Sequence, residues 1–203
     1  MVKKLVGAAL GAAALVYGVA AQAAYTITLR QVGPDVVATG SGSFSLAGLG
    51  TPVSSVVGGF MLPAMASVGV GPVPPMSSVD VYMAPMSGPA DFGTGAVPSF
   101  ANSGSGAPTG INGTAGAIGV PMGYVANTPL GTSAATWTGQ TFASLGVTPG
   151  TYVWTWGSGP TADSFTLIVG GASNIPTLSE WGAVSLAAAL GLLGFATLRR
   201  RRG

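Results

Sequence analysis

The stretch Thr151-Tyr152-Val153-Trp154-Thr155-Trp156 alternates between aromatic and smaller side chains. Because successive side chains of a β-strand point to opposite faces, Tyr152, Trp154 and Trp156 share one face of the predicted strand. Residues 164–169 alternate in the same way, and turn-forming residues fill the connection at 157–163. The two stretches together predict a β-hairpin with a moderately long loop.

The same pattern recurs near the other end of the body. Tyr25, Ile27 and Leu29 alternate with polar residues, and Gly33-Pro34-Asp35 then turns the chain into a second strand over 36–46. Shorter strands are predicted at four further places, 53–62, 78–83, 117–125 and 135–142. Gly-rich residues 88–116 are expected to form a long surface loop. The fold class is therefore all-β, a single β-sandwich-like domain of short antiparallel strands.

Charge is scarce and lies mostly at the two ends of the chain. Charged residues make up 6% of the 203 residues, where soluble domains carry about 25%. Residues 24–174 hold one arginine and four aspartates, a net charge of −3, which argues against nucleic-acid binding. The sequence contains no cysteine and no histidine, which excludes disulfides, Cys/His zinc sites and imidazole catalysis. No cofactor and no metal site is predicted.

Residues 1–23 have the features of a secretory signal peptide. Lys3 and Lys4 precede a short apolar run, and Ala21-Gln22-Ala23 forms a small-x-small pattern just before Ala24. We expect signal peptidase to cut in front of Ala24. An uncleaved anchor helix is the alternative.

Residues 175–203 form a second targeting segment made of three consecutive parts. The motif at 175–182 contains Ile175, Pro176, Thr177, Leu178, Trp181 and Gly182. An apolar run at 183–198 follows, which as a helix of about 16 residues would span roughly 24 Å of the bilayer. The basic tail at 199–203 contains Arg199, Arg200, Arg201 and Arg202. Since positively charged flanks stay in the cytoplasm, these arginines, with Lys3 and Lys4, place the body outside.

This order of parts resembles the IPTL-CTERM sorting domain, a relative of the PEP-CTERM signals. The resemblance rests on the sequence IPTLSEWG, the apolar helix after it and the arginine-rich tail. It implies recognition by an exosortase, a membrane-embedded enzyme similar to cysteine transpeptidases, which cuts near the motif and releases or re-attaches the body. A plain C-terminal membrane anchor is the alternative.

Segments of the body resemble a module found in PEP-CTERM-type exported proteins. They are DVVATGSGSFSLAGL at 35–49, FASLGVTPGTYVWTWGSG at 142–159 and ADSFTL at 162–167. This resemblance implies a secreted β domain and adds no activity.

Few residues of the body could carry catalysis. Asp35, Asp91 and Asp163 lie among turn formers, where aspartate commonly bonds to nearby backbone, and Asp80 lies in a predicted strand. A hydrolase would need two of these carboxylates to converge. The row of Tyr152, Trp154 and Trp156 suits a buried core, with an exposed platform for stacking sugars as the alternative.

The function predicted from sequence is that of an exported structural or interaction protein of the cell envelope or extracellular matrix, not an enzyme. Its predicted partners are signal peptidase, an exosortase-type enzyme and, transiently, membrane lipid, with extracellular polysaccharide as a further candidate. The precursor is expected in the inner membrane and the mature protein at the cell surface or outside the cell.

Overall fold

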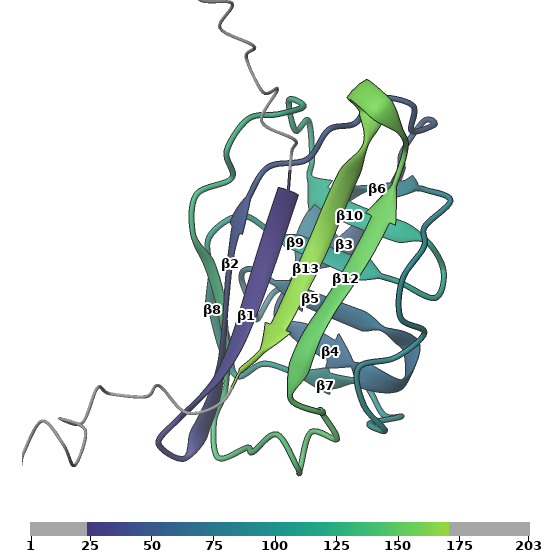
Figure 1. The fold of residues 1–203 in the computed structure, drawn as a ribbon. Coiled ribbons are helices and arrows are strands. Elements are labelled where there is room, and N and C mark those ends of the chain that lie inside the picture. Colours follow the sequence, from purple (N-terminus) through teal and green to yellow (C-terminus); the bar gives the residue numbers. More distant parts are fainter. Residues whose placement is uncertain (1–23, 171–203) are drawn as a thin grey trace, which may run out of the picture.

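A computed structural model describes residues 24–170, which form two β-sheets (Figure 1). Sheet A has six strands, in the order β12 (Gly150–Trp156), β13 (Asp163–Val169), β1 (Ala24–Val32), β2 (Asp35–Gly42), β11 (Ser133–Trp137) and β8 (Ser103–Ser105). Sheet B has seven, in the order β3 (Val53–Val57), β6 (Ser77–Met83), β10 (Ala117–Pro121), β9 (Thr109–Asn112), β5 (Ser67–Val70), β4 (Phe60–Leu62) and β7 (Ser99–Phe100). Two short 3₁₀ turns, η1 (Pro63–Met65) and η2 (Gly159–Thr161), complete the described elements.

The predicted all-β class is confirmed for this part of the chain. Between residues 24 and 170, no helix has the length and apolar character needed to span a bilayer. The predicted signal helix and the predicted transmembrane helix at 183–198 lie outside the described residues.

Both hairpins predicted from alternation are present in sheet A. β12 and β13 pair antiparallel with Trp154 opposite Phe165, and β1 and β2 pair antiparallel around a turn at Gly33, whose φ is 59°. A left-handed backbone of this kind favours glycine, because a Cβ would strain it.

One strand pair of sheet A departs from the predicted antiparallel arrangement. β1 and β13 pair in parallel, from Ala24 beside Ser164 to Leu29 beside Val169. These are the first and last strands of the body, so no tight turn joins them and no hairpin fixes their relative direction. The prediction of antiparallel strands alone is therefore wrong for this pair.

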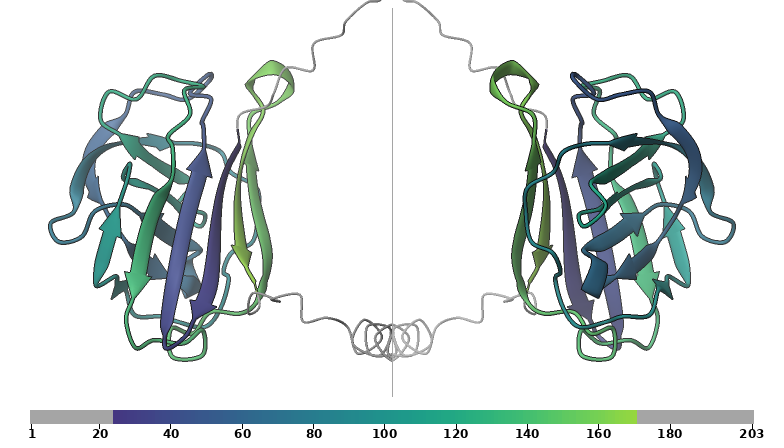
Figure 2. Two further views of the ribbon diagram at one scale, coloured as in Figure 1. Left: turned by 90° about the vertical axis from the view of Figure 1, so that its left-hand side faces the viewer. Right: turned by 90° about the vertical axis from the view of Figure 1, so that its right-hand side faces the viewer.

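The two sheets enclose one hydrophobic core (Figure 2). Sheet A contributes alternate residues of its strands, whereas all four residues of β5 in sheet B are buried. Aromatic rings cluster under sheet A, where Tyr25 stacks on Phe44 with ring centroids 5.0 Å apart and Trp154 meets Phe165 edge to face at 6.0 Å. This aromatic cluster explains why the alternating stretches are so strongly marked in the sequence.

The prediction that residues 88–116 form a surface loop is wrong. This stretch contains β7, β8 and β9, and Thr109, Gly110 and Ile111 of β9 are buried. β9 lies in the middle of sheet B, between β10 and β5. Because Gly110 supplies no polar side chain between the buried Thr109 and Ile111, this strand lacks the polar–apolar alternation that identifies a half-exposed strand.

The shorter predicted strands are found with different limits. The stretch at 53–62 divides into β3 and β4 at Gly58 and Gly59, and 78–83 corresponds to β6. The strand predicted at 117–125 ends at Pro121, and the one predicted at 135–142 runs instead from Ser133 to Trp137.

Candidate functional site

The aromatic row on β12 belongs to the core. Trp154 is 0% exposed and Trp156 is 3% exposed. The indole Nε1 of Trp154 donates a hydrogen bond of 2.8 Å to the carbonyl oxygen of Pro89, and Tyr152, which is partly buried, stacks on Trp154 at 6.5 Å. A sugar-stacking platform needs open ring faces, so the carbohydrate-binding hypothesis for these three residues is wrong.

The four aspartates of the body are used in different ways. Asp35 accepts a hydrogen bond of 2.8 Å from the backbone N–H of Gly139, and Asp80 accepts one of 2.8 Å from that of Gly123. Asp91 is exposed. Within residues 24–170, no group of three side chains of the types that commonly ligate metals was found.

Asp163 is the aspartate whose surroundings the sequence did not predict. It is 4% exposed, and it accepts hydrogen bonds from the backbone N–H groups of Ser45 at 2.8 Å and Ser164 at 2.6 Å. Burial raises the pKa of its carboxyl group to about 6, against the opposing effect of these two donors. Its position after a run of turn formers suggested a turn residue, yet one of its partners lies far away in the sequence.

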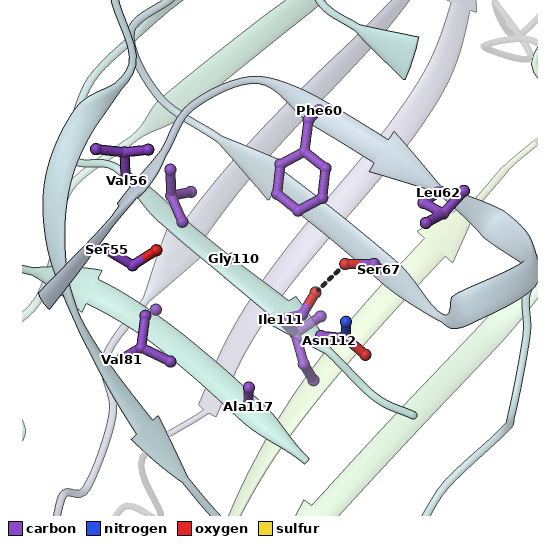
Figure 3. Close-up of a pocket in the computed structure, with 12 residues that line it drawn as sticks. Ser55, Val56, Phe60, Leu62, Ser67, Val81, Gly110, Ile111, Asn112 and Ala117 are labelled. Atoms are coloured by element: carbon purple, nitrogen blue, oxygen red, sulfur yellow. Dashed lines mark hydrogen bonds between the residues drawn. The ribbon is translucent and has the colours of Figure 1, made fainter. Parts of the chain in front are cut away.

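A shallow groove of about 320 Å³ lies on sheet B (Figure 3). Phe60, Leu62, Val56 and Val81 provide apolar walls. None of the lining residues is charged: they are Ser55, Val56, Val57, Phe60, Leu62, Ser67, Val81, Gly110, Ile111, Asn112, Ala117 and Gly119. Such a surface can contact uncharged or apolar groups, and it offers no charged side chain for acid-base chemistry.

Two glycines, Gly110 and Gly119, line this groove, and Gly69 lies next to Gly110 in the sheet. The strand registers place Gly69 of β5 beside Gly110 of β9, and Gly110 beside Gly119 of β10. A Cβ at Gly69 would lie 2.7 Å from the ring of Phe60, and one at Gly119 would lie 3.2 Å from a methyl group of Val57. The three glycines therefore let Phe60 and Val57 pack closely over the sheet. The glycines themselves are visible in the sequence, but the sequence does not show that they lie side by side on neighbouring strands.

The first and last strands place the two ends of the body. β1 begins at Ala24, and β13 ends at Val169, followed by a hydrogen bond of 3.2 Å from the N–H of Gly170 to the carbonyl of Leu29. Because the strands are parallel, β1 starts at one end of sheet A and β13 finishes at the other (Figure 1). Gly170, the last residue that the structure describes before the motif, thus lies five positions before Ile175.

Comparison with known proteins concerns the segment beyond this end. Residues 175–202 match the IPTL-CTERM motif. The IPTL-CTERM motif is a C-terminal sorting motif, and it marks an exported, envelope-associated protein. Its presence implies a processing or sorting enzyme as a partner. No curated protein and no solved structure matches the chain.

The IPTL-CTERM match covers every residue predicted for sorting, from Ile175, Pro176, Thr177 and Leu178 through Trp181 and Gly182 to the four arginines 199–202. These residues, and Lys3, Lys4, Ala21 and Ala23 at the other end, lie outside the described part of the chain. Of the predicted signal-peptidase residues, Ala24 alone is described, as the first residue of β1.

Proposed function

We propose that this chain is a structural or interaction protein of the cell envelope or extracellular matrix, without catalytic activity of its own. An exosortase-type enzyme processes it at the IPTL-CTERM motif. The precursor sits in the inner membrane until the motif is cut, and the β body is then released or attached at the cell surface. The observation that carries the proposal is the motif match at 175–202, directly behind a folded body.

The positions of the first and last strands, β1 and β13, are compatible with two cleavage events. Signal peptidase cleavage after Ala23 would leave Ala24, which is the first residue of β1, as the new N-terminus. Cleavage at the IPTL-CTERM motif would fall after Gly170, beyond the last strand. Both cuts would therefore leave sheet A complete.

The short connection between body and motif supports processing close to the membrane. Four residues, 171–174, separate the described body from the motif, and an extended chain of four residues reaches at most about 14 Å. A membrane-embedded enzyme would thus meet the motif within about 14 Å of the last described residue. The extended backbone that Pro176 favours at Ile175 would be the part that the enzyme binds.

The test is to follow processing of a tagged chain in cells. An epitope inserted at Gly50 should leave the body folded, because this residue is exposed and a Cβ added there would meet no atom within 4 Å. We expect mass spectrometry of the mature protein to find Ala24 at the N-terminus and a C-terminus within or near 175–182. Deleting the sorting enzyme should leave the full C-terminal segment in place.

A motif variant and a matched control complete the design. Pro176→Ala should accumulate in the inner membrane with its C-terminal segment uncut, whereas Pro160→Ala, in the exposed turn η2, should be processed normally. Surface protein that still carries residues 183–198 would contradict the proposal, as would normal processing of Pro176→Ala.

A further inference from the structure

The two described sheets have four edge strands, and three of them are covered by other parts of the chain. The outer edge of β12 exchanges a pair of hydrogen bonds, of 2.8 and 2.9 Å, with the backbone of Ser87. β8 is bridged by Val73. β7 has two residues, and the carbonyl of Ser99 accepts the indole N–H of Trp137 at 3.2 Å. Each of these contacts occupies an edge that could otherwise pair with a further strand.

β3 (Val53–Val57) is the fourth edge strand, and its outer edge is open. Val53 is 65% exposed and Val56 is 51% exposed, and the two serines between them are exposed as well. Within residues 24–170, no backbone hydrogen bond joins β3 to a segment other than β6. Natural proteins commonly protect such an edge with lysine, proline or a bulge, and β3 contains neither residue and pairs with β6 in unbroken register. An unprotected edge is a template for another strand.

The ladder between β6 and β10 shows which backbone groups of β3 face the open side. The N–H of Ala84 donates a hydrogen bond of 2.7 Å to the carbonyl of Gly116, so the even-numbered residues of β6 direct their backbone groups toward β10. The odd-numbered residues of β6 therefore bond to β3, and their register partners are the odd-numbered residues of β3. The N–H and C=O groups of Ser54 and Val56 thus point outward from the edge.

We propose that β3 pairs antiparallel with β3 of a second copy of this chain, about a two-fold axis at Ser55. In this register Ser54 lies opposite the partner's Val56, and Val56 lies opposite the partner's Ser54. The outward N–H and C=O groups of these residues then bond to each other in both copies, which leaves none of them unpaired. This proposal concerns the body alone and does not depend on the sorting function.

The side chains and charges of β3 fit a second copy of the same strand. Val53, Ser55 and Val57 share one face, where Val53 would contact the partner's Val57 and Ser55 would lie opposite the partner's Ser55. The strand carries no charge. Asp80, which is in register with Ser54 on β6, already accepts a backbone N–H, and it lies one strand away from the axis. No like charges would therefore face each other across the pair.

Pairing would also join the grooves of the two copies. Ser55 and Val56 lie along one side of the groove on sheet B (Figure 3). Because the axis is perpendicular to the sheet, both uncharged grooves would open on the same face of the joined sheets. A ladder of this length is smaller than the interface of a stable dimer, so we expect the association to be reversible.

Cysteine cross-linking of the full chain in detergent tests the pairing, because the chain contains no cysteine of its own. The two copies of residue 55 would form a non-hydrogen-bonded pair with Cα atoms about 4.5 Å apart, a distance that a disulfide spans. Ser55→Cys should therefore give a disulfide-linked dimer when a mild oxidant is added.

Ser54→Cys is the matched control on the same strand. Ser54 is exposed like Ser55, but its two copies would lie on a diagonal about 7 to 8 Å apart, beyond the usual reach of a disulfide. The dimer should therefore be lost in this variant. Association through any other part of the chain would bring the two cysteine positions together equally often.

A charge placed on the edge gives an independent variant. Added to Ser55→Cys, Val56→Lys should abolish the dimer, because lysine on an edge strand opposes pairing. Val153→Lys in the same background alters an exposed valine on β12, whose edge is covered by Ser87, and should leave the dimer unchanged. Both substitutions replace exposed side chains, so both variants should fold.

The outcomes separate self-pairing from its alternatives. Equal dimer yields from Ser54→Cys and Ser55→Cys, or a dimer from Ser54→Cys alone, would overturn the proposed register. A dimer that persists with Val56→Lys would place the contact elsewhere and overturn the pairing. If Ser55→Cys gives no dimer while circular dichroism shows the wild-type strand content, β3 does not pair with a second copy.

Discussion

Sheet A and sheet B use the same few residue types in opposite ways. In sheet A, long strands alternate between the core and an outer face, so that on β13 every second residue from Asp163 to Val169 is buried. In sheet B, the central strands are short, and β5 is buried along its whole length. Sheet A is stabilised by large aromatic side chains, whereas sheet B depends on the absence of side chains at Gly69, Gly110 and Gly119. Large buried side chains thus stabilise one sheet of this β domain, and glycines that let neighbouring groups pack against the backbone stabilise the other.

The largest expected effect tests whether sheet A depends on its large buried aromatic side chains. Trp154→Ala removes a fully buried ring that contacts Phe165 and Tyr152, together with the hydrogen bond to Pro89. We expect the free energy of unfolding to fall by about 4 kcal/mol, measured by urea denaturation. Val153→Ala, on the same strand but 41% exposed, should change it by less than about 1 kcal/mol. Equal losses in the two variants would contradict the division into core and outer faces.

The next effect tests whether sheet B depends on glycines that allow neighbouring groups to pack directly against its backbone. In Gly69→Ala, the added Cβ would lie 2.7 Å from the ring of Phe60 and 2.8 Å from the backbone oxygen of Gly58. We expect a loss of about 2 to 3 kcal/mol in the same denaturation experiment, because neither neighbour can withdraw freely. Gly50→Ala has open space around its Cβ and should be neutral or slightly stabilising. If Gly69→Ala left the free energy of unfolding unchanged, sheet B would not depend on the absence of a side chain at this position.

The smallest effect is a pH dependence that originates in sheet A. The pKa of Asp163 is about 6 in the folded chain and is expected near 3.9 in the unfolded chain. Between these values the folded state holds the proton more tightly, so this group stabilises the fold fully below about pH 4 and loses that contribution as pH rises through 6. From about pH 4.5 to about pH 7.5, the free energy of unfolding should fall by about 2 kcal/mol.

Urea denaturation at several pH values measures this fall. Asp163→Asn should remove it, while Asp80→Asn, at an exposed hydrogen bond in sheet B, should keep the wild-type profile. A fall that persists in Asp163→Asn would place its origin elsewhere in the molecule.

The contrast between the sheets also explains which features could be predicted from the sequence. The hairpins around Trp154 and Ile27 were predicted correctly because one face of each strand is polar and the other apolar, which leaves a period of two. β5 and β9 were missed because all but one of their residues are buried, so no exposed polar face marks a period of two in their sequences. Their glycines resembled loop residues until the registers placed Gly69, Gly110 and Gly119 side by side.

The functional features divide in a similar way. The sorting segment was predicted because its motif, apolar run and arginines are contiguous, and the match at 175–202 agrees with it. For Trp154 and Trp156 the sequence left two interpretations open, a buried core, which was favoured, and a sugar-stacking platform. The structure decides between them, because both side chains are buried. The surroundings of Asp163 could not be predicted, because its partner Ser45 lies 118 positions away.

The parallel pairing of β1 with β13 has a mechanical consequence. A pull transmitted through Gly170 acts along the axis of β13, which is flanked by β1 on one side and by β12 on the other. Such a load is a shear, and it is shared by the hydrogen bonds of both ladders at once instead of opening them one after another. A body tethered at this end is therefore built to resist tension.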